Sequence, residues 1–209
     1  LIFKPITHIT NNDWKNVLIS RMIKNSMNLY CAHTNLDYAE KGVNWSLAKA
    51  LKLDKIENIG NSKKIVYKNG NSAFEKNYSL AKIGTLEAAK NLETFISVIK
   101  QSLGIRHIRI IGKTPDIYYK DINKVMVFAG SFDEDILHYI SAKFDVIVTG
   151  DIKHHTAIEM AEKGLCVIDA GHYATENIIV PVISDMLRNK FPNINIISKN
   201  MDTEPFIFC

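Results

Sequence analysis

The sequence predicts an α/β fold in which a mixed sheet is flanked by helices. After Ile105, apolar runs of strand length alternate with segments that have helical periodicity. Three turns between them are polar or contain glycine: Gly130-Ser131, Thr149-Gly150-Asp151 and Gly171-His172. Because sites in such sheets form at the carboxyl ends of the strands, we expect these turns to share one edge of the sheet.

Three elements are expected in the first quarter of the chain. Asn12 and Asp13 suit the cap of a helix, and Gly42 precedes a second helical pattern. The elements are a helix from Trp14 to Lys24, a strand from Met27 to Cys31 and a helix from Trp45 to Leu51. The segment His33 to Asp37 would then lie on the loop between strand and helix, where functional residues are common.

The middle of the chain contains short strand candidates and one long helix. The strand candidates are Ile56 to Ile59, Lys64 to Tyr67 and Tyr78 to Ile83, with a turn signal at Asn69-Gly70-Asn71. From Ala88 to Leu103, apolar residues fall on one stripe, which predicts a helix that Gly104 ends.

The second half alternates regularly. The expected strands are Ile105 to Ile111, Lys124 to Phe128, Val146 to Thr149, Leu165 to Asp169 and Ile194 to Ile197; the expected helices are Asp133 to Lys143, His155 to Lys163 and one that ends near Asn189. Pro181 fits the first turn of that last helix but not its middle. Glu176 would then belong to a separate short turn before it.

The chain has 209 residues, 46% of them hydrophobic, which suits one globular domain. We expect a single domain over residues 1–209, built from two intertwined α/β lobes at roughly 1–103 and 104–209. The two site-like segments, around Asp37 and His172, fall one in each half, so a cleft between the lobes would bring them together. The stretch between Asp37 and Gly130 leaves little room for an inserted third domain.

Composition argues against several classes of partner. The formal net charge is +4 and the lysines are scattered among acids, so we expect no nucleic-acid partner. The three cysteines, Cys31, Cys166 and Cys209, have no CxxC spacing, which indicates a reduced, cytoplasmic setting. No apolar run is long enough to cross a bilayer and no signal peptide is visible, so we expect no membrane partner.

Acid and imidazole side chains follow strand-like runs at two places. Asp37 ends one segment, while His172 and Glu176, four residues apart, straddle a change from strand to helix. Such ligands suit first-row divalent ions, and bridging carboxylates suit two of them. Simpler interpretations stay open: Asp37 as a turn former, Glu176 as a favourable charge at a helix start, and His33 as a satisfied imidazole rather than a ligand or a ligand's partner.

A third cluster is Lys153-His154-His155. Adjacent histidines point in different directions on a helix, so one would face the cleft, where it could transfer a proton. Lys153 would either receive a phosphate or face solvent. The sequence has no GxGxxG, Walker, GxSxG or HExxH motif, which leaves a dehydrogenase, kinase or serine hydrolase without support.

Six ordered blocks resemble a known family, the dinuclear-metal proteins called GTP cyclohydrolase 1 type 2 homologues or NIF-three-like proteins. The resemblance spans essentially the whole chain. The blocks are Leu1-Ile2-Phe3-Lys4-Pro5-Ile6, His33-Thr34-Asn35-Leu36-Asp37 with Gly42-Val43-Asn44, Ala129-Gly130-Ser131, Asp145 to Asp151, Gly171-His172-Tyr173-Ala174-Thr175-Glu176 and Thr203-Glu204-Pro205-Phe206. Phe132 departs from the family, which tends to have a small residue after Gly-Ser.

The resemblance implies that Asp37, His172 and Glu176 are metal ligands. The family's other two ligands are histidines of an HHP block that directly precedes its LIF segment, and this chain opens at Leu1, so we expect N-terminal residues to be missing. It also implies a ring-shaped homohexamer with two divalent ions, Zn, Mn, Fe, Co or Mg, in the cleft between the lobes.

Two functions follow as expectations. The first is a dinuclear metal-dependent hydrolase that acts on a nucleotide or related small molecule through a metal-bridged hydroxide, with His154 or His155 as proton shuttle and His33 or Lys153 near the ligands or substrate. The alternative is a non-catalytic metal-binding assembly protein that stores, delivers or senses metal or presents a ring surface to protein partners. The substrate would follow from analogy alone.

Overall fold

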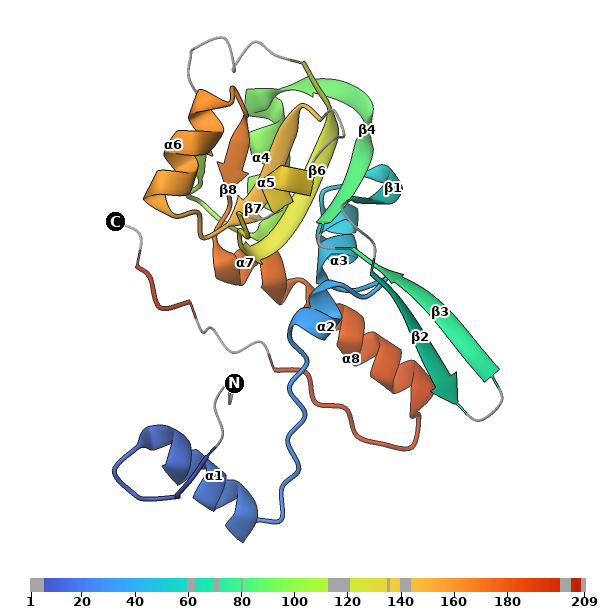
Figure 1. The fold of residues 1–209 in the computed structure, drawn as a ribbon, viewed down its shortest axis with the longest axis vertical. Helices are drawn as coiled ribbons and strands as arrows, with labels where there is room; N and C mark the ends of the chain where they lie inside the picture. Colours follow the sequence, from blue (N-terminus) through green and yellow to red (C-terminus); the bar gives the residue numbers. More distant parts are fainter. Residues whose placement is uncertain are drawn as a thin grey trace. The chain divides into compact units, whose positions relative to one another are not determined.

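The computed structural model describes residues 6–59, 63–69, 72–79, 81–112, 121–134, 136–139, 144–199 and 204–207. For residues 63–69, 72–78 and 138–139 the structure describes the backbone. The chain divides into two compact units, Leu1–Thr34 and Asn35–Cys209, and each is treated by itself. Figure 1 labels the helices and strands along the chain.

The first unit contains helix α1, Trp14–Lys24, where the sequence predicts it. The Asp13 side chain accepts a hydrogen bond from the Lys15 backbone N–H at 2.7 Å and so caps the helix. The predicted strand from Met27 to Cys31 is wrong, because the segment is irregular and exposed. In the described part of the chain it has no neighbouring strand, and an isolated apolar run cannot form a ladder.

The second unit is built on a six-stranded sheet in the order β1-β4-β6-β7-β8-β5. The strands are β1 Asp54–Ile59, β4 Ala81–Asn91, β5 Arg109–Ile111, β6 Asp121–Ser131, β7 Val146–Gly150 and β8 Val167–Asp169. β6, β7 and β8 run parallel, whereas the pairs β1/β4, β4/β6 and β5/β8 are antiparallel. The predicted mixed α/β sheet is confirmed.

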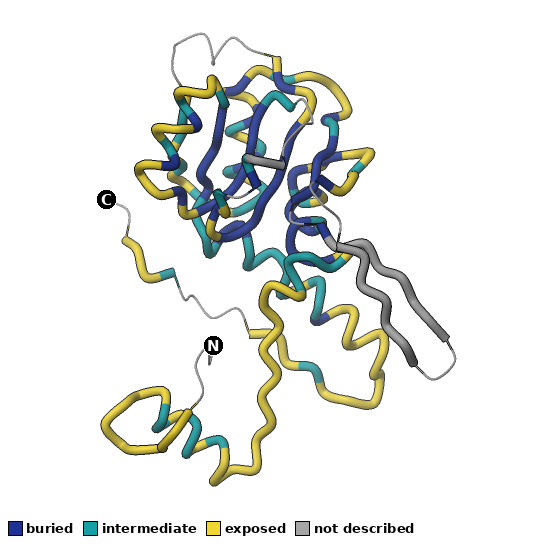
Figure 2. The backbone as a smooth tube through the Cα atoms, viewed as in Figure 1, coloured by how far each residue is buried: buried dark blue, intermediate teal, exposed yellow. Residues whose placement is uncertain are grey.

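Helices cover both faces of the central strands. They are α2 Thr34–Asp37, α3 Val43–Ala50, α4 Leu92–Leu103, α5 Ile136–Tyr139, α6 His154–Glu162, α7 His172–Asn177 and α8 Ile179–Lys190. Val125 and Val127 of β6 pack with α3 and α4, and Met126 between them packs on the opposite side with Met160 of α6. Successive side chains of a strand point to opposite faces of the sheet. Because helices pack on both faces, the central parts of β6 and β7 are buried on both sides, as Figure 2 shows in dark blue.

The middle of the chain departs from the prediction in its boundaries. Strands β2, Lys63–Asn69, and β3, Ser72–Tyr78, form a separate antiparallel pair, while the predicted turn residues Gly70 and Asn71 lie outside the described residues. The single strand predicted from Tyr78 to Ile83 is wrong. Strand structure is interrupted at buried Ser79, between β3 and β4. The Oγ of Ser79 donates a hydrogen bond to the Ile59 carbonyl oxygen at 2.5 Å and so links this interruption to the end of β1.

Helix α4 begins later than predicted but ends at the expected residue. Strand β4 continues through Ala88 to Asn91, whose side chain accepts a hydrogen bond from the Thr94 N–H at 2.8 Å and caps α4. Gly104 ends the helix in the left-handed conformation at φ 66°, which suits glycine. Sheet pairing with β6 therefore overrides the helical pattern at 88–91.

The last third confirms one prediction and overturns another. Pro181 lies in the first turn of α8, and Glu176 belongs to the separate short helix α7, as expected. The predicted strand Ile194–Ile197 is wrong, because this segment is irregular and Ile197 is 81% exposed. Of the helix predicted from Asp133 to Lys143, the described residues form only α5, and residues 135 and 140–143 lie outside them.

The predicted lobes, residues 1–103 and 104–209, both contribute strands to the six-stranded sheet. The two-lobe organisation stays a prediction. Among the described residues, no helix is long and apolar enough to cross a membrane.

Candidate functional site

The three parallel strands end together at one edge of the sheet. Ser131 at the end of β6 is in register with Gly150 of β7, and Thr149 of β7 is in register with Asp169 of β8. Asp151 follows β7 directly, and α7 begins two residues after Ala170 with His172. The predicted gathering of these turns at the carboxyl ends of the strands is confirmed.

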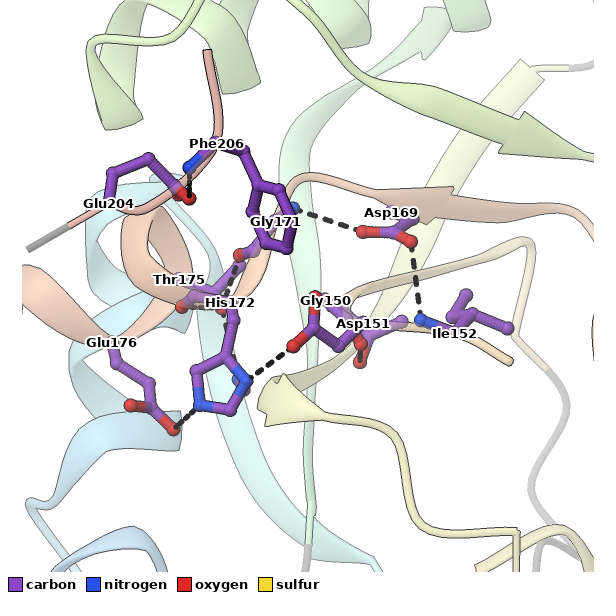
Figure 3. Close-up of polar contacts among 12 residues, drawn as sticks. Gly150, Asp151, Ile152, Asp169, Gly171, His172, Thr175, Glu176, Glu204 and Phe206 are labelled. Atoms are coloured by element: carbon purple, nitrogen blue, oxygen red, sulfur yellow. Dashed lines mark hydrogen bonds and ion pairs between the residues drawn. The ribbon is translucent and has the colours of Figure 1, made fainter. Parts of the chain in front are cut away.

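His172 lies between two carboxylates (Figure 3). Its Nδ1 is 2.8 Å from Oδ2 of Asp151, and its Nε2 is 3.1 Å from Oε1 of Glu176, one turn later on α7. The hydrogen bond to Glu176, helped by Asp151, outweighs partial burial and raises the pKa of His172 to about 9. At neutral pH the imidazole is therefore charged and donates from both nitrogens.

Asp169 fixes the two loops that carry this pair. Its side chain is only 3% exposed; Oδ1 accepts from the Gly171 N–H at 3.0 Å, and Oδ2 accepts from the Ile152 N–H at 3.3 Å and pairs with Arg109. Gly171 precedes His172 and Ile152 follows Asp151. One buried carboxylate thus positions the backbone on both sides of the His172–Asp151 hydrogen bond.

Gly130 allows the backbone of β6 to approach Glu176. A Cβ at this position would lie 2.2 Å from Oε1 of Glu176 and 3.4 Å from Nε2 of His172. The residue also has φ 72°, which side chains rarely adopt. Only glycine leaves the carboxylate and imidazole their present positions.

Two buried polar side chains tie this edge to the segment of Asp37. Thr175 accepts from the Gly130 N–H at 3.0 Å, and Asn44 accepts from the Ala129 N–H at 2.7 Å. The Asn44 amide also donates to the Asp37 carbonyl oxygen at 3.1 Å. The backbone of Asp37 is therefore linked through one side chain to the residue before Gly130.

The charge of Asp37 also acts at this edge. Burial raises the pKa of Tyr38, and the charges of Asp133 and Asp37 raise it further. Asp133 lies on the loop after β6, so the hydroxyl of Tyr38, the residue after Asp37, lies near that loop. Asp37 itself ends the four-residue helix α2, where the sequence predicts a loop.

The start of α6 forms a polar cluster with Glu134. Oε1 of Glu134 is 3.0 Å from His155 Nε2, 2.6 Å from Thr156 Oγ1 and 3.5 Å from Lys153 Nζ. The Thr156 hydrogen bond, the charge of His155 and the charge of Lys153 lower the pKa of Glu134. A pocket of about 400 Å³ adjoins this cluster and is lined by Ser131, Phe132, Asp133, Glu134 and Lys153.

The structure brings some of the predicted site residues together and leaves others apart. His172 and Glu176 are in contact, whereas His154 is exposed on the first turn of α6. His33 belongs to the other unit, Leu1–Thr34, so its predicted place near the ligands stays a prediction. Among the described residues, no group of three or more His, Cys, Asp or Glu side chains is arranged to hold a metal ion. The ligand set Asp37, His172 and Glu176 stays a prediction.

Sequence reasoning assigned no role to Asp151 or Asp169. Both lie in segments that it singled out, at the ends of β7 and β8. Their positions directly after buried strands were the available signal, because polar side chains there reach the functional edge of a parallel sheet.

The fold and the site define the class of protein. It is an α/β protein with a mixed sheet, in which an imidazole lies between two carboxylates at the carboxyl edge of the parallel strands. The sequence model of one family, Duf34/NIF3 (NGG1p interacting factor 3), matches residues 1–205. The chain belongs to this family.

Curated relatives carry one common name. A protein of Clostridium acetobutylicum named "GTP cyclohydrolase 1 type 2 homolog" is 29% identical over 94% of this chain and 68% of its own length. A Methanocaldococcus jannaschii protein of the same name is 31% identical over 84% of this chain and 63% of its own length.

Solved structures agree with the fold. Staphylococcus aureus protein SA1388 matches with a TM-score of 0.84 at 26% identity, covering 100% of this chain and 78% of its own. A Bacillus cereus protein related to NIF3 matches with a TM-score of 0.83 at 23% identity, covering 100% of this chain and 81% of its own.

Proposed function

We propose that this protein is a dinuclear metal-dependent hydrolase in which Asp37, His172 and Glu176 are ligands. The observation that carries the proposal is the orientation of His172. Its Nδ1 is held by Asp151, which leaves Nε2 beside Glu176. A metal-binding histidine usually has its other ring nitrogen bound in this way by a carboxylate.

The chemistry of the donor set fits a divalent cation. An imidazole and carboxylates suit Zn, Mn, Fe or Co. Binding of an ion at Nε2 would displace the proton that His172 shares with Glu176. When bound, a pair of such ions lowers the pKa of a shared water and supplies a nucleophile near neutral pH.

The neighbouring pocket supports a small polar substrate. It opens at Ser131, the residue after Gly130, and Lys153 supplies a cation that can pair with a phosphate. His155 at Glu134 forms an imidazole–carboxylate pair suited to hold and move a proton at Nε2. The name carried by the relatives supports a nucleotide as the substrate class.

The test compares the metal content of purified variants. Metal content is measured after dialysis for the parent and for His172→Ala and Glu176→Gln, with Glu159→Gln on the exposed face of α6 as control. We expect stoichiometric metal in the parent and control and a large loss in the two site variants. Unchanged metal in both would refute the ligand assignment.

Catalysis is tested separately. GTP and other nucleotides are offered with Mn, Zn or Mg, and turnover is compared between the parent and Lys153→Met. Metal binding without turnover or thermal protection by any nucleotide would reject the hydrolase and favour a non-catalytic metal-binding assembly protein. Native mass spectrometry of the same samples tests the homohexamer that we infer from the family resemblance.

A further inference from the structure

Lys82 is a buried lysine that the proposed hydrolase does not use. It lies on β4 and is only 2% exposed, although lysine is almost never fully buried without a charged partner. Its Nζ instead donates to the neutral amide oxygen of Asn58, the residue opposite it on β1. Within the described ranges this amide is the hydrogen-bond partner of Nζ, and a neutral amide compensates an ammonium poorly for its lost hydration.

Lys82 also lines a pocket of about 340 Å³. The walls come from the turn between α2 and α3, from α3 and from β1. The remaining lining residues are Glu40, Lys41, Trp45, Ile56, Glu57 and Asn58. None of them lines the pocket beside Glu134, so the two hollows are separate.

The environment of Lys82 disfavours its charged form. Burial lowers the pKa of Lys82, and the charge of Glu40 opposes this effect only in part. The other charged groups at the pocket are Lys41 and Glu57, one of each sign. A desolvated lysine of this kind is the usual way in which proteins activate an amine as a nucleophile.

We propose that Lys82 forms an imine with a small 2-oxo acid bound in this pocket. The neutral Nζ attacks the carbonyl carbon, and a proton passes from nitrogen to the carbonyl oxygen to give a carbinolamine. Loss of that hydroxyl with a proton, as water, forms the C=N bond, so no oxidant or reductant is required. Lys41 is the cation that pairs with the carboxylate of the ligand, and the Glu40 carboxylate is the group that accepts the proton released at Nζ and returns it to the leaving hydroxyl.

The experiment uses glyoxylate with cyanoborohydride, which reduces an imine to a stable secondary amine. Labelled lysines are then identified by peptide mass spectrometry over time. We expect Lys82 to be labelled faster than exposed Lys52 and Lys190, because burial lowers its pKa and so raises its fraction of free amine. Labelling of Lys82 at or below the rate of those two lysines would overturn the proposal.

Two variants test the roles. Lys82→Met, which is one atom shorter and lacks the amine, should remove the fast label. Lys41→Met should slow labelling of Lys82 by glyoxylate but not by neutral propanal. If Lys82→Met fails to fold, the rates in the unmodified protein decide alone. Labelling is repeated with and without added divalent metal; an unchanged rate at Lys82 separates this site from the proposed metal centre, whose failure would leave the result intact.

Discussion

The carboxylate of Glu176 lies against the backbone of Gly130, so closely that a Cβ there would come within 2.2 Å of Oε1. One residue of β6 thus sets the space in which the side chains of α7 converge. The contact joins residues 46 positions apart, and it exists only because β6 and α7 meet at the carboxyl edge of the sheet.

Gly130→Ala should be more destabilising than an ordinary glycine substitution. The left-handed backbone costs an alanine about 1–2 kcal/mol, and the added Cβ also forces the partly exposed Glu176 side chain away from its contact with His172. Gly164→Ala is the matched control, since Gly164 has a similar φ of 70° with nothing within 4 Å of its Cβ. Urea unfolding of both variants measures the difference, and equal losses would contradict the close contact.

Asp169→Asn should loosen both loops of the site. The amide keeps one acceptor oxygen, so one of the two backbone N–H groups that Asp169 binds loses its partner at a cost of about 1–3 kcal/mol, and the ion pair with the exposed Arg109 is lost as well. Arg109→Met should cost less, because Arg109 is 67% exposed and Asp169 keeps its two backbone donors. Denaturation midpoints check the order, and a larger loss in Arg109→Met would argue against Asp169 as the anchor.

Asn44→Ala should destabilise the protein, because it removes the side chain that links the backbone of Asp37 to β6. It leaves the buried Ala129 N–H without its acceptor, at a cost of about 1–3 kcal/mol. Ser46→Ala on the same helix is the control, because in the described part of the chain Ser46 Oγ is buried without a hydrogen-bond partner. Thermal unfolding should therefore separate the two variants, and similar melting temperatures would contradict this assignment.

The metal-free protein should lose stability at alkaline pH through His172. The folded-state pKa is raised to about 9 from an ordinary value near 6.5, so the stabilising contribution is full below about 6.5 and is lost as pH rises through about 9. Imidazole NMR signals followed from pH 5 to 10 give this pKa directly. In His172→Gln the corresponding fall in melting temperature should be absent, and a His172 midpoint near 6.5 would contradict the ion pairs.

The sequence predicts the parts of the fold that depend on local pattern. The β-branched runs at Val146–Thr149 and around Val125 read as buried strands because both of their faces are apolar. The runs at Met27 and Ile194 look similar, yet they form no strand, since a ladder needs a neighbour that composition does not reveal. Pairing also decides the boundary at Asn91, where the sheet continues into a helical pattern.

For the candidate site, too, the sequence predicts the local contact but not the long-range one. His172 and Glu176 converge because four residues make one helical turn, which the spacing alone indicates. The contact of His172 with Asp151, 21 positions away, depends on β7 and β8 being neighbours in the sheet. Strand order is a property of the whole chain, so neither this contact nor the role of Asp169 follows from a short motif.

At the edge of the sheet, different residues hold the loops in place and line the pocket, which has a consequence for redesign. Asp169 holds the loops that carry His172 and Asp151 through two backbone hydrogen bonds. Ser131, at the end of β6, and the loop residues Phe132 to Glu134 line the neighbouring pocket. Substitutions in the loop after β6 can alter the size and polarity of this pocket while the hydrogen bonds of Asp169 stay intact. Ligand preference can thus be diversified by a library confined to a handful of consecutive codons.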